Sequence, residues 1–214
     1  DGKGIKIAVI DTGVDHLHPD LYGFGTGGKI VDGFNFVDES KMPLDTNGHG
    51  TEVSGIIASD GQLKGIAPKA SIVAYKVSED GESVSSDLII KAVNKAIEDD
   101  VDIINISLGV NKTNSKIDDV VNKATKNGIL VVAAAGNDGP ETKSIGSPGQ
   151  SSSAITVGAT YNNLTASLVA TLEVEGKQFE VVPMMGTSLL EEPITEKIVF
   201  GEYGRQRDLS DDSF

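Results

Sequence analysis

Residues 5–13 read IKIAVIDTG, an apolar and β-branched run that ends at an aspartate and a Thr-Gly turn. Apolar runs of this length typically form strands that are buried on both faces of a parallel sheet. Three later runs have the same character, at residues 71–77 (SIVAYKV), 103–108 (IINISL) and 129–134 (ILVVAA). We therefore expect four buried strands, each followed by turn-forming residues.

Helical patterns lie between these runs. In residues 87–99 the apolar side chains recur at the spacing of one helical face, and residues 117–127 show the same pattern before an Asn-Gly stop. Strands that alternate with amphipathic helices form a sheet that is covered on both faces. The sequence therefore predicts an α/β fold, a three-layer sandwich around a mostly parallel sheet.

Composition excludes several classes of function. The 214 residues carry 18 Lys and Arg against 32 Asp and Glu, a net charge of −14, which argues against nucleic acid or an anionic membrane surface as a partner. The chain has no cysteine, so disulfides, a thiolate nucleophile and cysteine-based metal sites are excluded. No apolar run reaches the roughly 18 residues of a membrane span, and any export signal would lie upstream of Asp1 or have been removed.

The chain changes character near residue 160. Most of its 25 glycines precede this point, whereas residues 161–214 are poor in glycine and more densely charged. Residues 168–174 and 179–182 flank a turn at Gly176, a pattern typical of a β-hairpin. We expect residues 1–160 to form one α/β unit and residues 161–214 to form a separate β-rich segment.

Polar residues follow the predicted strands, and in an open parallel sheet ligands bind at the carboxyl ends of the strands. Asp11 follows the first strand, and Asn137 follows the fourth. Each is also compatible with an ordinary turn. His49 lies between two glycines, ahead of a predicted helix that Thr51 is a candidate to cap. If the Asp11 carboxylate holds one imidazole nitrogen, the other is free to act as a general base.

The motifs resemble those of the subtilisin-like serine proteases, the subtilases or peptidase family S8. The resemblance covers residues 1–160 and rests on residues 8–15 (AVIDTGVD), 49–51 (HGT), 105–109 (NISLG) and 133–137 (AAAGN). Residues 136–160 are most similar to the secreted bacterial branch of Vpr and the cell-envelope proteinases, which carry an inserted protease-associated (PA) domain. The resemblance implies a subtilisin-like fold, here incomplete, and a secreted or cell-surface endopeptidase acting on polypeptides.

The resemblance also implies roles for individual residues. Asp11 would orient and support His49, which would deprotonate a serine, and the Asn137 amide would form half of an oxyanion hole. An extended substrate would be bound as an added strand. The residues expected to bind it are Ser107, Leu108 and Gly109 on one wall, and Ala134, Ala135 and Gly136 on the opposite wall of the S1 pocket.

The serine does not stand in its usual context. Ser188 ends a Gly-Thr-Ser tripeptide like that of the family, but residues 189–193 read LLEEP, which cannot continue as a buried helix of small residues. We expect Ser188 to be a chance match. The chain would then end before the nucleophile, and residues 191–203 resemble the lead-in to a PA insert.

Two positions depart from the family pattern. Glu52 stands where a second histidine is usual, and it either raises the pKa of the His49 imidazole or is a solvated surface residue. Many members bind calcium in a longer loop than residues 59–65, completed by an aspartate that matches Asp20. We therefore expect no cofactor and no complete metal site, with Asp20 left as a partial calcium ligand.

The alternative function is non-catalytic, either a pseudoprotease or a surface module that binds proteins. The residues that follow Phe214 would distinguish the two, because a Gly-Thr-Ser that opens a helix of small residues supports the protease. A dinucleotide-binding domain is excluded, because the turn after Asp11 lacks the Gly-x-Gly-x-x-Gly pattern that seats a pyrophosphate.

Overall fold

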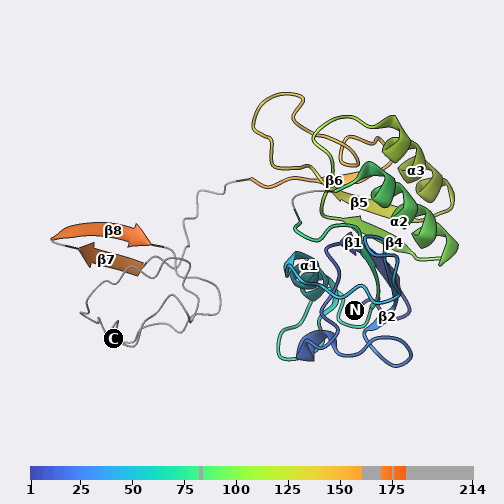
Figure 1. The fold of residues 1–214 in the computed structure, drawn as a ribbon, viewed down its shortest axis with the longest axis horizontal. Coiled ribbons are helices and arrows are strands. Elements are labelled where there is room, and N and C mark those ends of the chain that lie inside the picture. The colour runs from blue at the N-terminus through green and yellow to red at the C-terminus, as the bar shows by residue number, and fades with distance from the viewer. Residues whose placement is uncertain (82–83, 161–169, 175, 182–214) are drawn as a thin grey trace. The chain divides into compact units, whose positions relative to one another are not determined.

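The computed structural model describes residues 1–81, 84–160, 170–174 and 176–181. The chain divides into two compact units, Asp1–Thr160 and Tyr161–Phe214, and each is described by itself (Figure 1). None of the helices in the described ranges is long and apolar enough to cross a bilayer.

The first unit is built on a six-stranded sheet with the order β2-β3-β1-β4-β5-β6, in which every pairing is parallel. Its strands are β1 (Lys6–Asp11), β2 (Ile30–Asn35), β3 (Ser71–Lys76), β4 (Ile103–Ile106), β5 (Leu130–Ala134) and β6 (Ile155–Val157). Its helices are the short 3-10 helix η1 (Pro19–Leu21), α1 (His49–Ala58), α2 (Ser86–Glu98) and α3 (Ser115–Lys126).

Strand β1 lies at the centre of the sheet, and its side chains alternate between two cores. Ile7 and Val9 belong to a core that also contains Ala58 of α1, whereas Ala8 and Ile10 belong to a second core with α2 and α3. Successive side chains of a strand point to opposite faces, so the helices cover both faces of the sheet. The result is the predicted three-layer α/β sandwich.

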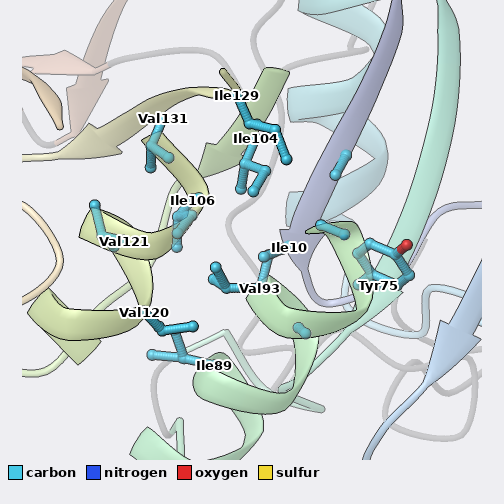
Figure 2. Close-up of a cluster of buried hydrophobic side chains, with 14 of the residues drawn as sticks. Ile10, Tyr75, Ile89, Val93, Ile104, Ile106, Val120, Val121, Ile129 and Val131 are labelled. Carbon is cyan, nitrogen blue, oxygen red and sulfur yellow. The ribbon is translucent and has the colours of Figure 1, made fainter. Parts of the chain in front are cut away.

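The larger core lies between the sheet and the helices α2 and α3 (Figure 2). These two helices contribute apolar side chains at the helical spacing that the sequence predicts. Figure 2 labels Ile89 and Val93 of α2 and Val120 and Val121 of α3, which face Ile10, Ile104, Ile106, Ile129 and Val131 of the sheet layer. All are 5% exposed or less. Burying an isoleucine or valine side chain contributes roughly 1.5–3 kcal/mol, so this layer carries much of the stability.

The four predicted strands and the helices predicted at residues 87–99 and 117–127 are confirmed, with ends that differ by a few residues. The strands β2 and β6 were not predicted. Strand β2 contains Asp32-Gly33 and a register shift between Ile30 and Asp32, which hide its pattern, and β6 has only three residues. Helix α1 begins at His49, not after Thr51, with Gly48 as its N-cap in the left-handed region at φ +113°.

The described residues of the second unit form an antiparallel pair, β7 (Ala170–Val174) and β8 (Lys177–Val181). The turn between them contains Gly176 at φ +77°, a conformation that glycine adopts without strain. The predicted hairpin is therefore present, with a second strand that begins two residues earlier than the sequence indicated. Residues 182–214, among them Ser188, lie outside the described residues.

The core predicts that two isoleucines contribute very differently to the free energy of unfolding. Ile106 of β4 is fully buried, whereas Ile56 on α1 is 62% exposed. We expect Ile106→Ala to lower the free energy of unfolding by about 2–5 kcal/mol, since it removes buried surface and leaves a cavity. The matched control Ile56→Ala should stay within about 0.5 kcal/mol of the parent. Urea unfolding followed by circular dichroism measures both, and equal losses would contradict this core assignment.

Candidate active site

The end of β1 and the start of α1 bring Asp11 and His49 into contact. Asp11 is the last residue of β1 and is fully buried. Its Oδ1 lies 2.7 Å from Nδ1 of His49 and accepts a second hydrogen bond, also 2.7 Å, from the backbone N–H of Thr12. Because a carboxylate accepts hydrogen bonds, Nδ1 of His49 carries the proton and Nε2 is left as the basic nitrogen. Within the described residues, Nε2 makes no hydrogen bond.

The carboxylate of Asp11 is buried, and this burial strengthens its interaction with His49. Within the described part of the chain its Oδ2 is buried and has no hydrogen-bond partner. A buried carboxylate is poorly screened by solvent and stabilises a neighbouring positive charge. The side chain of His49 is 44% exposed. The pair thus combines a carboxylate that is shielded from solvent with an imidazole that is partly exposed. This arrangement is suited to proton transfer.

Side chains from outside α1 satisfy the free amides of its first turn. The N–H of His49 donates to Oδ1 of Asn47, that of Gly50 to Oγ1 of Thr12, and that of Thr51 to Oδ2 of Asp45. The predicted cap at Thr51 is wrong: Thr51 lies inside the helix, and its hydroxyl donates to Asp45. The first N–H groups of a helix lack intrahelical partners, so these contacts fix where α1 begins.

A cavity of about 620 Å³ opens beside His49. The structure brings eight of the nine predicted site residues to its wall, and the ninth, Asp11, lies buried behind His49. The eight are His49, Ser107, Leu108, Gly109, Ala134, Ala135, Gly136 and Asn137. A cavity of this size is within the usual range for a ligand site.

Sequence reasoning missed other parts of the wall, such as Val53, Val84, Asp138, Gly146 and Ser147. Ser147 pairs with Val110 in an isolated antiparallel bridge, through a hydrogen bond of 2.9 Å from Val110 N to Ser147 O. Residues 37 positions apart form this contact, so no local spacing in the sequence indicates it.

Backbone groups on both walls of the cavity are free. Within the described residues, neither Leu108 and Gly109 on one wall nor Gly136 and Asn137 on the other form a backbone hydrogen bond. The side-chain amide of Asn137 is also without a partner there and is exposed. Exposed backbone donors and acceptors at the end of a strand can pair with an extended polypeptide.

Glu52 is exposed in the first turn of α1, and no hydrogen bond or ion pair joins its side chain to His49 or to any other described residue. An acidic side chain in a first helical turn interacts favourably with the helix dipole. The structure thus favours the second alternative for Glu52, a solvated helix residue.

Asp20 is buried and serves the loop that follows α1. Its Oδ1 and Oδ2 accept backbone N–H groups of Gln62 and Leu63 at 2.8 and 3.0 Å. The hydrogen bond from Leu63, followed by that from Gln62, lowers the pKa of Asp20. A cation would meet these N–H groups, so the residues present do not fit a calcium ion at Asp20. Within the described residues, no three acidic or histidine side chains gather as a metal site requires.

Comparison with known proteins identifies the family. The sequence profile of the subtilase family matches residues 2–199. The minor extracellular protease Vpr of Bacillus subtilis (strain 168) is 40% identical over 171 residues, which cover 74% of this chain and 21% of that protein. The major intracellular serine protease of the same organism is 42% identical over 170 residues, which cover 74% of this chain and 51% of that protein.

A solved structure agrees. A cold-adapted subtilisin-like serine proteinase superposes with a TM-score of 0.66 at 33% identity, over 75% of this chain and 56% of that chain. The chain belongs to the subtilase family of subtilisin-like serine proteases. It spans about half or less of the length of the two relatives named above.

The hydrogen bonds of Asp20 predict how its loop responds to calcium and to pH. We expect Asp20→Asn to lower the melting temperature by a few degrees, equally with calcium and with a chelator, since an amide cannot accept both N–H groups. The folded pKa of Asp20 is lowered, so its stabilisation is present above the unfolded pKa of about 3.9 and is lost as pH falls through the folded value. Melting curves should therefore separate the two proteins at pH 7 and bring them closer at pH 3. A calcium-dependent melting temperature that Asp20→Asn abolishes would contradict this reading.

Proposed function

We propose that the complete protein is a serine endopeptidase with an Asp-His-Ser triad to which this chain contributes Asp11 and His49. The observation that carries the proposal is the 2.7 Å contact between the buried Asp11 carboxylate and Nδ1 of His49, beside an open cavity. Membership of the subtilase family supports the same reaction.

In the proposed mechanism, Nε2 of His49 takes the proton from a serine hydroxyl as the serine oxygen bonds to the carbonyl carbon of the substrate. The carbonyl π electrons move to the oxygen, and Asp11 stabilises the imidazolium. When the tetrahedral intermediate collapses, the C–N bond breaks and His49 donates the proton to the leaving amine. Water then hydrolyses the acyl-enzyme by the same steps.

Asn137 is proposed as one donor to the oxyanion of this intermediate. Its exposed amide lines the same cavity as His49 and has no partner among the described residues. A donor of this kind is worth about 3–4 kcal/mol of transition-state stabilisation in subtilisin. Ser107, Leu108 and Gly109 would bind the substrate backbone from one side, and Ala134, Ala135 and Gly136 would form the opposite wall of the S1 pocket.

The nucleophile is proposed to follow Phe214. Ser188 lies outside the described residues, and the LLEEP sequence after it does not suit a buried helix. Residues 1–160 would then be the N-terminal part of the catalytic domain. Residues 161–214 would be a β-rich segment leading into a PA insert, as in the Vpr branch. The 40% identity to Vpr, of which the match covers 21%, supports this arrangement.

We also propose that the complete protein is secreted or located at the cell surface. Vpr is extracellular by name, although a relative of similar identity is named as intracellular. The lack of cysteine leaves the compartment open. Fractionation of the source cells, with detection of the intact protein in medium, wall and cytoplasm, tests this location.

A non-catalytic binding protein is the second candidate. Membership of the subtilase family does not favour it, and it would require that no serine hydroxyl of the complete protein reach Nε2 of His49. In that case the cavity would bind polypeptide without cleaving it, through the free backbone of Leu108 and Gly109. The complete sequence distinguishes the two, since only the protease requires a serine at the start of a buried helix.

The triad predicts the effect of two substitutions in the complete protein. We expect Asp11→Ala or His49→Ala to lower kcat for peptide hydrolysis by several orders of magnitude, because triad members act as a unit. The double variant should lose little more than His49→Ala alone. Glu52→Gln, at an exposed position on the same helix, is the control and should retain kcat. Near-parental hydrolysis by a folded His49→Ala protein would exclude the mechanism.

For the 214-residue chain by itself we expect no catalytic activity. We expect it neither to hydrolyse peptides nor to react with a serine-directed phosphonate, because attack requires a hydroxyl within about 3 Å of the histidine nitrogen. Mass spectrometry of the treated chain detects any adduct. Labelling that disappears in a folded Ser188→Ala variant would identify Ser188 as the nucleophile after all.

A further inference from the structure

We propose that Asp45 is a positioning residue for His49, whose carboxylate fastens the first turn of α1 to the turn that follows β1. The inference rests on the proposed function, in which His49 is the general base. Asp45 does not line the cavity. It acts through His49 and is not itself a catalytic residue.

The carboxylate of Asp45 accepts five hydrogen bonds. Its Oδ1 accepts from Thr12 Oγ1 at 2.9 Å and from the backbone N–H groups of Asn47 and Gly48 at 2.9 and 3.0 Å. Its Oδ2 accepts from the backbone N–H and the hydroxyl of Thr51 at 2.9 and 2.6 Å. Five donors exceed what a neutral side chain of this size can accept, so the site is built for a carboxylate.

Three of these bonds, one from Thr12 and two from Thr51, join the two elements that carry the proposed acid–base pair. Thr12 follows Asp11 directly, and its hydroxyl both donates to Asp45 and accepts the N–H of Gly50, next to His49. Thr51, two residues after His49, donates to Asp45 and accepts the N–H of Asp15. His49 is therefore held between Thr12 and Thr51, both of which bind the same carboxylate.

The loop that carries Asp45 is fixed on its other side. The buried ammonium of Lys76, at the end of β3, donates to Leu44 O at 3.0 Å and to Thr46 Oγ1 at 3.1 Å. Pro43 O accepts the N–H of Val14. A Cβ at Gly13, whose φ is +108°, would lie 2.5 Å from Pro43 O, so only glycine permits this close approach. These contacts thus fix the position of the loop that carries Asp45 relative to the end of β1.

The charge of Asp45 suits its position. It lies at the N-terminus of α1, where the helix dipole favours an anion. Burial alone would raise the pKa of Asp45, but the hydrogen bonds from Gly48, Thr51 and Asn47 outweigh this effect and lower it. Asp45 is therefore ionised over the whole pH range in which a histidine acts as a base.

The test reads the hydrogen bond of His49 directly, in the 214-residue chain. Long-range ¹H–¹⁵N spectra report which imidazole nitrogen carries the proton, and the chain has three histidines, so His16 and His18 serve as internal reports of folding. In the parent, His49 should be the Nδ1–H tautomer, because Nδ1 faces Asp11. In Asp45→Asn, the ratio of Nδ1–H to Nε2–H tautomer should fall about tenfold, the worth of one hydrogen bond to a charged group.

Three matched variants complete the experiment. Thr51→Val removes one donor to Asp45 and should shift the ratio in the same direction, whereas Thr51→Ser keeps the hydroxyl and should not. Asp38→Asn changes an exposed aspartate that accepts a single backbone N–H in the segment before α1, and it should leave His49 unchanged. If Asp45→Asn does not fold, the Thr51 pair decides. An unchanged tautomer ratio in folded Asp45→Asn, or in Thr51→Val when Asp45→Asn does not fold, would overturn the proposal.

Kinetics of the complete protein separate this inference from the proposed function. Because Asp45 lies outside the cavity, Asp45→Asn should lower kcat about tenfold and leave KM within about twofold. If His49→Ala retained hydrolysis, the proposed function would fail while the tautomer result stood. If His49→Ala lost hydrolysis but Asp45→Asn kept the parental kcat, the positioning role would fail and the proposed function would stand.

Discussion

A carboxylate without exposed surface is the constraint on which this site depends. Asp11 ends a strand that is buried on both faces, so its charge must be stabilised by fixed donors in place of water. The donors are the N–H of Thr12 and Nδ1 of His49. The first comes from the residue next in the chain, whereas the second requires that α1 start beside the end of β1, within reach of Oδ1. The helix, the loop before it and the turn after β1 are therefore parts of one arrangement.

The sequence predicts the elements whose burial is regular and misses those whose burial is not. β1, β3, β4 and β5 are apolar runs, of which β1 and β3 are buried on both faces of the sheet, whereas β4 and β5 are fully buried on one face only. Helices α2 and α3 show one apolar face each. The edge strand β2 carries Asp32 and Gly33, so its pattern resembles a loop. The three residues of β6 are too few to show a period.

The candidate site likewise contains residues that the sequence indicates and others that it does not. Asp11, His49 and Asn137 stand out because each follows or precedes a recognisable element, and their neighbours match family motifs. Asp45 also lies in the segment before His49, but an aspartate ahead of Asn-Gly reads as an ordinary turn residue. Only its hydrogen bonds to Thr12 and Thr51 distinguish it. Contacts between distant segments, such as Val110 with Ser147, have no counterpart in local spacing.

A crystal structure of the complete protein after reaction with a peptidyl phosphonate tests the central claim most directly. The account predicts a covalent bond from phosphorus to a serine beyond Phe214, with that serine oxygen within about 3 Å of Nε2 of His49. It also predicts a phosphonyl oxygen beside the amide of Asn137, and a peptide backbone paired with Leu108 and Gly109. An adduct on Ser188, or a bound peptide without an adduct and away from His49, would contradict the account.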